Sequence, residues 1–119
     1  MLSSGDVRVL LKVAKDAVIT YLKEGYHIKP PTMIPQGLKD RKAGVFVTVS
    51  KLDDLLMKSK VVSCCGNPIS TKPLVEAVID FSVSAAIRAK LLASVRSEES
   101  DKLLLTVNVL TKPELIHVE

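Results

Sequence analysis

The feature that most constrains the fold is the apolar segment from Pro73 to about Ser94. Four of its polar residues stand four positions apart and form one narrow face: Glu76, Asp80, Ser84 and Arg88. This spacing predicts a helix, because residues four apart are neighbours on a helix surface. Proline is tolerated in a first helical turn, and Ser70 or Thr71 is available as a cap. A helix so apolar is buried on more than one side, so we expect it to be the central core element.

A second helix is predicted from Asp6 to Glu24, where the apolar residues follow the spacing of a single helical face. Ser3 and Ser4 can cap its exposed amides, and Gly25 stands where a left-handed residue ends a helix. The remaining positions are mostly charged. We therefore expect an amphipathic surface helix that packs one stripe on a sheet.

Alternating apolar and polar residues predict the strands of that sheet, which are 44–50, 59–65, 103–110 and a short final strand at 115–118. A short helical turn is expected between Ser50 and Lys58, and Gly66-Asn67-Pro68 is expected to end the second strand. The sum is an α+β fold, a mostly antiparallel sheet covered on one face by two main helices.

The prolines and Gly37 within the segment from Tyr26 to Lys42 exclude a regular element there, because each proline removes an amide donor. The segment is longer than most connections in compact domains, which favours a role beyond linkage. We expect it to lie on the core through four apolar side chains: Ile28, Met33, Ile34 and Leu38.

Composition excludes several classes of protein. A chain of 119 residues with 47% hydrophobic residues suits one folded domain and does not suit a disordered segment. Two adjacent cysteines cannot form a disulfide scaffold, and no run of about 20 apolar residues predicts a membrane span. Residues 1–5 lack the features of a signal peptide, so a cytoplasmic location is expected. The net charge of +4 and the scarcity of aromatic residues leave a basic nucleic-acid module as only a weak alternative.

The candidate site is the run Ser63-Cys64-Cys65-Gly66-Asn67-Pro68, at a strand end that enters a turn. If both cysteines are extended, their side chains point to opposite faces and do not share a metal. No standard metal or cofactor signature accompanies them, so neither a metal nor a cofactor is expected. Two interpretations stay open: an inert buried thiol, or a nucleophile or binding group at Cys64 where Gly66 lets a ligand approach the backbone. The binding residues under the second interpretation are Cys64, Cys65, Gly66, Asn67 and Pro68.

Five segments in this order resemble the AMMECR domain family across nearly the whole chain. They are Tyr21-Leu22-Lys23, the proline-rich loop 30–35, the strand Gly44-Val-Phe-Val-Thr48, Pro73-Leu-Val-Glu-Ala77 and Val107-Asn-Val-Leu-Thr-Lys-Pro-Glu114. The family hallmark LRGCIG stands here as Val61-Val-Ser-Cys-Cys-Gly66. Val62 and Ser63 thus replace the arginine and first glycine of the hallmark, and only Cys64 and Gly66 match it. The family also has an Asp-x-Arg-Phe-like stretch after the helix that begins here at Pro73, and this stretch is not recognisable around residues 89–92.

The resemblance implies a single AMMECR-like α+β domain over residues 1–119 that lacks the usual C-terminal portion of the family. It also implies an accessory role in a pathway with Memo-type and radical S-adenosylmethionine proteins, the expected protein partners. Our leading hypothesis is a non-enzymatic binding module that uses the groove around Cys64, Gly66 and the 30–35 loop. The rival is an enzyme with Cys64 as nucleophile and a backbone amide near Gly66 as oxyanion donor. Self-association through uncovered apolar surface is a further expectation.

Overall fold

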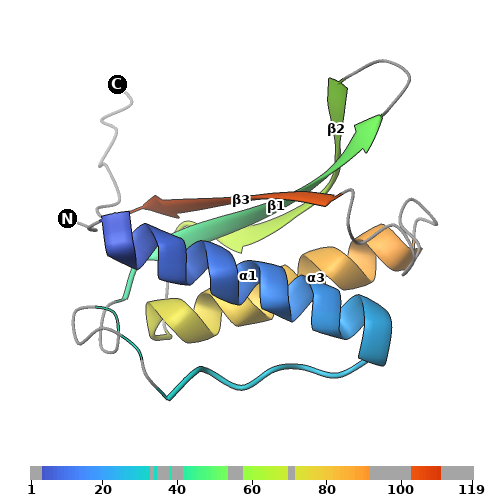
Figure 1. Cartoon of the computed structure of the whole chain (residues 1–119). Helices are drawn as coiled ribbons and strands as arrows, with labels where there is room; N and C mark the ends of the chain where they lie inside the picture. Colours follow the sequence, from blue (N-terminus) through green and yellow to red (C-terminus); the bar gives the residue numbers. More distant parts are fainter. Residues whose placement is uncertain are drawn as a thin grey trace, which may run out of the picture.

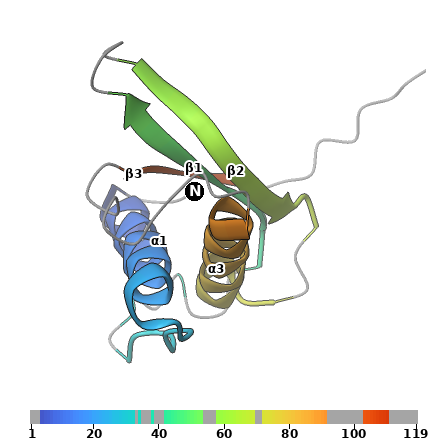
Figure 2. The same ribbon diagram turned by 90° about the vertical axis from the view of Figure 1, so that its right-hand side faces the viewer.

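The computed structural model describes residues 4–32, 34, 38, 42–53, 58–69, 72–91 and 103–110. The elements follow the order α1 (Ser4–Glu24), β1 (Gly44–Asp53), β2 (Lys58–Asn67), α3 (Leu74–Leu91) and β3 (Leu103–Leu110). They form two layers, with the strands in one layer and the two helices side by side in the other (Figure 1). This arrangement confirms the predicted α+β class and the packing of both helices on one face of the sheet (Figure 2).

The sheet has the strand order β2-β1-β3, and both strand pairs are antiparallel. Val47 on the central strand lies opposite Cys65 on one side and Val107 on the other. The β1–β2 register shifts between Val49 and Ser50, whose partners are Ser63 and Val61. Val62 is therefore the extra residue of a β-bulge, and the inward and outward alternation of β2 changes at this point.

The core lies between the sheet and the helices. Val45, Val47 and Val49 alternate along β1 and are fully buried, because they face the helix layer. Most of α3 is buried, including polar Ser82, which confirms its prediction as the central core element. Helix α1 contributes one stripe, as its amphipathic pattern predicts: Leu10, Val13, Ala14, Ala17, Val18 and Leu22.

Helix α1 ends as its sequence predicts. Gly25 has a φ of 78° and donates its backbone N–H to the carbonyl of Tyr21 at 2.9 Å. A residue in this left-handed conformation satisfies a terminal carbonyl of the helix. The ring of Tyr21 then makes an edge contact with His27, with the ring centroids 6.1 Å apart. Together these contacts hold the start of the following segment against the helix.

The proline-rich segment lies on the core as expected at three of its four apolar positions. Leu38 is fully buried, and Ile28 and Ile34 pack against the same cluster. Met33 lies outside the described residues. Leu38 is helical, so the prediction that this segment holds no regular element was wrong at that residue. Prolines exclude helix interiors, yet they are compatible with a first helical turn.

Other boundaries also differ from prediction. The expected helical turn after Ser50 is wrong over 50–53, because β1 continues to Asp53 in register with Lys58. Strand β2 continues to Asn67, since Gly66 and Asn67 still pair with β1. Helix α3 begins at Leu74, and the Pro73 carbonyl accepts a hydrogen bond from Ala77 at 3.0 Å. Several predicted features lie outside the described residues: the capping residues Ser3, Ser70 and Thr71, the helix beyond 91 and the final strand at 115–118.

In the described part of the chain, no helix combines the length and apolarity that a bilayer crossing needs.

Candidate functional site

The two cysteines of the candidate site occupy neighbouring positions on β2. Cys65 lies opposite buried Val47, is half-buried and packs against the core cluster that contains Leu22 and Val49. Cys64 lies opposite Thr48 and is exposed. Both thiols are free. Because successive residues of a strand face opposite sides, Cys64 points away from the helices, onto the open face of the sheet.

The Cys64 sulfur lies next to a hydroxyl group. Thr48 Oγ1 donates a hydrogen bond to Cys64 Sγ at 3.4 Å, and Arg88 Nη1 donates one to the Cys64 carbonyl at 3.5 Å. A threonine hydroxyl does not take a proton at neutral pH, so Thr48 does not act as the base that a nucleophilic thiol needs. The sulfur is accessible, but it lines neither of the two hollows described below.

Gly66 is covered by a side chain of the neighbouring strand. A Cβ atom built on Gly66 would lie 2.5 Å from Phe46 Cδ1 and closer still to the carbonyl oxygen of Val45. The glycine therefore permits close packing between β1 and β2. The backbone of Pro68 likewise passes too close to Gly44 for a side chain to fit there. The Cβ position of Gly66 is thus filled by the backbone of β1 and by Phe46.

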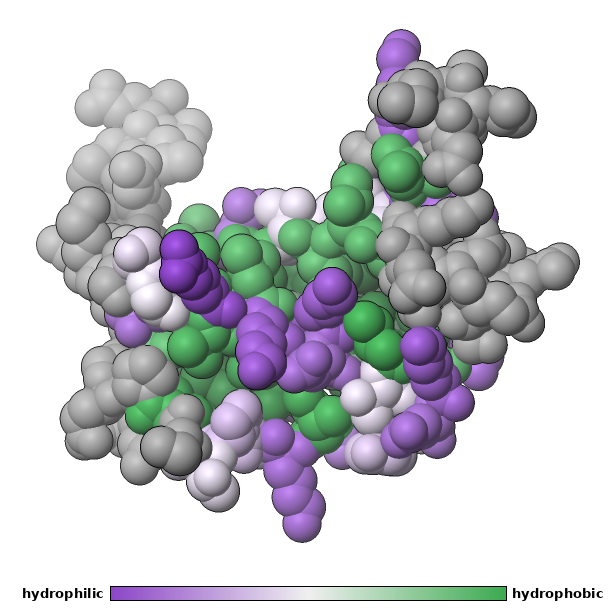
Figure 3. All heavy atoms as spheres, in the orientation of Figure 1, coloured by the Kyte–Doolittle hydropathy of each residue, from purple (hydrophilic) through white to green (hydrophobic). Residues whose placement is uncertain are grey.

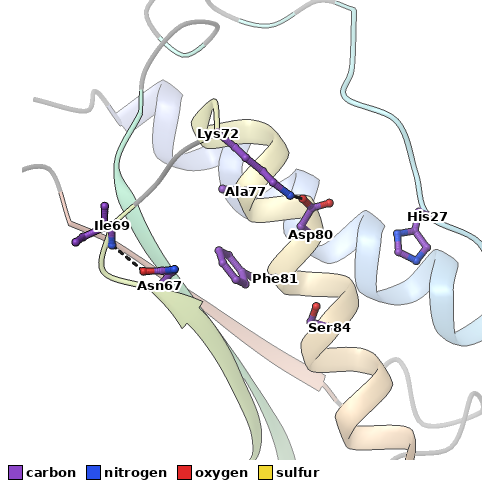
Figure 4. A pocket seen from close by; sticks show the side chains of 8 residues that line it. All are labelled: His27, Asn67, Ile69, Lys72, Ala77, Asp80, Phe81 and Ser84. Atoms are coloured by element: carbon purple, nitrogen blue, oxygen red, sulfur yellow. Dashed lines mark hydrogen bonds and ion pairs between the residues drawn. The ribbon is translucent and has the colours of Figure 1, made fainter.

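A pocket opens where β2 ends beside α3 (Figure 4). Its volume is about 390 Å³, within the usual range for small-ligand sites. The side chains that line it come from three parts of the chain: His27, Asn67, Ile69, Lys72, Ala77, Asp80, Phe81 and Ser84. Asn67 Oδ1 accepts a hydrogen bond from the backbone N–H of Ile69 at 3.0 Å, which fixes the turn after β2. The four α3 residues share one helix face because they are three, four and seven positions apart.

Opposite charges meet at the edge of this pocket. Lys72 donates a hydrogen bond to Asp80 and forms an ion pair with it (Figure 4). The hydrogen bond and the negative charge of Asp80 raise the pKa of Lys72, and Glu76 adds to the increase, whereas desolvation opposes it. Lys72 therefore keeps its positive charge at neutral pH. A ligand that enters the pocket meets a paired cation and anion.

A second hollow adjoins the first. Its volume is about 280 Å³, and Lys72 and Asp80 line it as well as the pocket. Ile28 and Pro30 border it on the side of the proline-rich segment, and Glu76 and Ile79 border it on α3. The two hollows adjoin at Lys72 and Asp80, and we call the pair of hollows the α3 groove. It runs from the end of β2 across α3 to the start of the proline-rich segment.

The structure therefore separates the residues that the sequence grouped together. Asn67 lines the α3 groove, but Cys64 faces the open side of the sheet, Cys65 packs against the core and Gly66 lies under Phe46. Pro68 is exposed at the turn. Of the proline-rich loop, Pro30 reaches the groove.

Sequence reasoning missed the ion pair of the groove, together with Phe81 and His27. A signal for Asp80 and Ser84 was present in the polar face of the helix predicted from Pro73 to about Ser94. Within the described residues, no cluster of three or more His, Cys, Asp or Glu side chains could hold a metal ion.

These features define a two-layer α+β domain with a groove along one helix. The sequence model of the AMMECR1 family matches residues 11–119, and the chain belongs to that family. The resemblance drawn from its five segments is thereby confirmed.

Similar proteins occur in archaea. A protein of Methanothermobacter thermautotrophicus is 35% identical over 118 residues, covering 99% of this chain and 58% of its own length. The protein PH0010 of Pyrococcus horikoshii is 38% identical over 107 residues, covering 90% of this chain and 51% of its own. The crystal structure of PH0010 superposes with a TM-score of 0.83 over 98% of this chain and 57% of that one. The chain thus spans little more than half the length of these relatives.

Proposed function

We propose that this chain is an accessory, protein-binding module of the AMMECR1 family whose α3 groove holds an extended segment of a partner protein. The observation that carries this proposal is that two hollows adjoin at the Lys72–Asp80 pair, which lines both. A compact metabolite would need only one of them. An extended peptide fits an elongated groove whose side pockets take alternate side chains.

The chemistry of the groove suits a neutral or basic peptide. Phe81 and Ile69 supply apolar contacts at one end, and Ile28 and Pro30 supply them at the other. Asn67 and Ser84 offer groups that hydrogen-bond to a peptide backbone. Glu76 and Asp80 outnumber Lys72, so an acidic segment would be repelled.

The partner proposed for this groove comes from the resemblance to the family. It implies a shared pathway with Memo-type and radical S-adenosylmethionine proteins, so we propose a segment of one of these as the natural occupant. In this proposal the cysteine run is structural and the groove performs the recognition.

Calorimetric titration of the purified chain with a purified Memo-type protein and with a radical S-adenosylmethionine protein tests the proposal. Ser84→Arg places a long charged side chain in the α3 groove. We expect it to weaken binding of the partner at least about tenfold, because the arginine covers the apolar surface of Phe81 and Ala77 in the same pocket. Ser4→Arg, at the exposed start of α1, makes the same chemical change outside the groove and should leave the affinity unchanged. Equal affinity for both variants, or no binding of either protein, would overturn the proposal.

A second candidate is catalysis by Cys64. It is favoured by the exposure of the Cys64 sulfur. The rate of thiol alkylation against pH tests it. An apparent pKa well below the ordinary value of about 8.5 supports a reactive cysteine, and an ordinary value removes this candidate.

A further inference from the structure

The side chain of Lys72 lies across the α3 groove. Lys72 stands two residues before α3 begins, and its side chain reaches along the helix to Asp80 (Figure 4). Both residues line both hollows, so their ion pair stands where the two hollows adjoin. A ligand that occupied both hollows would therefore meet the Asp80 carboxylate at the place where the Lys72 ammonium group now binds it.

The Lys72–Asp80 ion pair is accessible to water. The side chain of Lys72 is 53% exposed, and that of Asp80 is 42% exposed. An ion pair between exposed groups stabilises a fold only slightly, because water and salt screen the attraction and the long lysine side chain loses rotational freedom. A cation that arrives with a ligand can therefore replace Lys72 at Asp80 at little cost in free energy.

Without Lys72, the charge of the groove is negative. Glu76 is exposed, lines the second hollow and stands one helical turn before Asp80. Among the described residues that line the two hollows, Lys72 is the only lysine or arginine. Two carboxylates therefore remain when the Lys72 side chain moves away, and they are complementary to a positively charged group.

The exposed side of α1 has the opposite charge. The whole chain carries a net charge of +4, and hydrophilic side chains gather over the helix layer in Figure 3. The acidic residues Asp16 and Glu24 are outnumbered among the exposed residues of α1 by basic ones: Arg8, Lys12, Lys15 and Lys23. A positively charged ligand is repelled by this surface and attracted by the carboxylates of the groove, so charge directs it to the groove.

Phe81 adds a reason to expect an arginine side chain as this cation. It follows Asp80 in α3, and its half-buried ring lines the first pocket and points toward Asn67 (Figure 4). A guanidinium group is planar, binds a carboxylate through two parallel N–H bonds and stacks on an aromatic ring, whereas an ammonium group is a point charge. The hydroxyl of Ser84, which lines the same pocket, can accept another of its N–H groups.

We propose that the α3 groove recognises an arginine side chain of the segment that it binds. The guanidinium group replaces the Lys72 ammonium group at Asp80 and packs against the ring of Phe81. In the free chain Lys72 takes the place of this arginine at the carboxylate. This inference rests on the function proposed for the groove, and it adds the side chain that the partner must supply.

The test uses a small probe, so that it does not depend on the identity of the partner. N-acetyl-arginine methylamide is titrated into the isotope-labelled chain, and backbone amide signals are followed by two-dimensional NMR. N-acetyl-citrulline methylamide has nearly the same shape but no charge, and it serves as the matched probe. We expect the arginine probe to shift the signals of Asp80, Phe81 and Ser84 and to bind at least about fivefold more tightly than the citrulline probe, because a charged hydrogen bond is the stronger one.

Two variants should change the affinity for the arginine probe in opposite directions. Asp80→Asn keeps the shape of the side chain but removes its charge, so the arginine probe should bind no better than the citrulline probe. Lys72→Gln removes the competing ammonium group and should tighten binding about two- to fivefold, the small effect of breaking an exposed ion pair. Lys90→Gln, at the exposed end of α3, lowers the net charge equally and should leave the affinity unchanged.

Circular dichroism identifies any variant that fails to fold. If Asp80→Asn fails, Ser84→Arg replaces it, because the new guanidinium group stands one helical turn from Asp80 and competes with the probe. Ser84→Arg should abolish binding of the arginine probe, and unchanged binding would overturn the proposal.

Two further results would overturn the proposal: equal affinity for the arginine and citrulline probes, or a Lys72→Gln variant that binds the arginine probe no more tightly than the parent chain. Either failure is distinct from failure of the proposed function, which is measured by calorimetry with the partner proteins. If the arginine probe binds as expected and neither partner protein binds, the arginine site is supported and only the partners named for the groove are contradicted.

Discussion

The ring of Phe46 lies over Gly66 of the neighbouring strand, to which it is paired in the β1–β2 register. A Cβ atom at Gly66 would approach Phe46 Cδ1 to 2.5 Å, and it would also meet the backbone of β1. An aromatic side chain that packs over a glycine on the adjacent strand compensates for the contacts that the glycine lacks. One of the two hallmark residues that this chain keeps is thus explained by packing.

Gly66→Ala is expected to lower the free energy of unfolding by about 1–3 kcal/mol, the usual effect of overpacking. The added methyl group meets backbone atoms of β1, which move less readily than a side chain. Urea unfolding followed by circular dichroism measures the change. Gly5→Ala, at the exposed start of α1, makes the same chemical change in open surroundings and should stay within about 0.5 kcal/mol of the parent chain. A Gly66→Ala variant as stable as the parent would contradict the packing of Phe46 on Gly66.

The Lys72–Asp80 pair makes a prediction about alkaline pH. Because Asp80 raises the pKa of Lys72 above its ordinary 10.5, the pair stabilises the folded chain fully below that value and loses its contribution as the pH rises through the raised pKa. The urea midpoint of the parent chain should therefore exceed that of Lys72→Gln by a small amount at about pH 8. This difference should vanish once the pH has risen past the raised pKa of Lys72. Lys90→Gln, at the exposed end of α3, supplies the comparison. A difference that grows with pH would show that the pair does not stabilise the fold.

The elements could be predicted from the sequence because each depends on a local period. The apolar stripe of α1, the alternation of β1 and the left-handed Gly25 all follow from neighbouring residues. The residues at which the strands end were harder to predict from the sequence. Pairing between Asp53 and Lys58 extends the hairpin beyond what local propensity indicates, and the bulge at Val62 shifts the alternation of β2.

The site could be predicted only in part. Alternation places Cys64 and Cys65 on opposite faces, but which face is open depends on where the helices pack. The α3 groove depends on contacts between distant parts of the chain, since His27, Asn67 and Asp80 converge only in the folded protein. No spacing along the sequence encodes that convergence. The polar face of α3 was visible in the sequence, but the same pattern describes any solvated helix.

The two cysteines should react at different rates in the chain alone. Cys64 is exposed, whereas Cys65 is half-buried against the core. With a limiting maleimide reagent, Cys64 should react at least about tenfold faster, because reaction requires an accessible thiolate. Mass spectrometry of peptides measures the ratio, and Cys64→Ser and Cys65→Ser assign each phase. Equal labelling rates would contradict the strand register, which places the two thiols on opposite faces of the sheet.

Ser82 tests how the core tolerates a polar group. Its side chain is fully buried in α3, and within the described part of the chain its hydroxyl has no hydrogen-bond partner. Removing an unsatisfied buried hydroxyl relieves its desolvation penalty, and alanine also favours helix more than serine does. Ser82→Ala should therefore raise the free energy of unfolding by roughly 1 kcal/mol in urea titration. The reverse change at the equally buried Ala85, Ala85→Ser, should lower it by about 1–3 kcal/mol. A loss of stability in Ser82→Ala would show instead that this hydroxyl is hydrogen-bonded in solution.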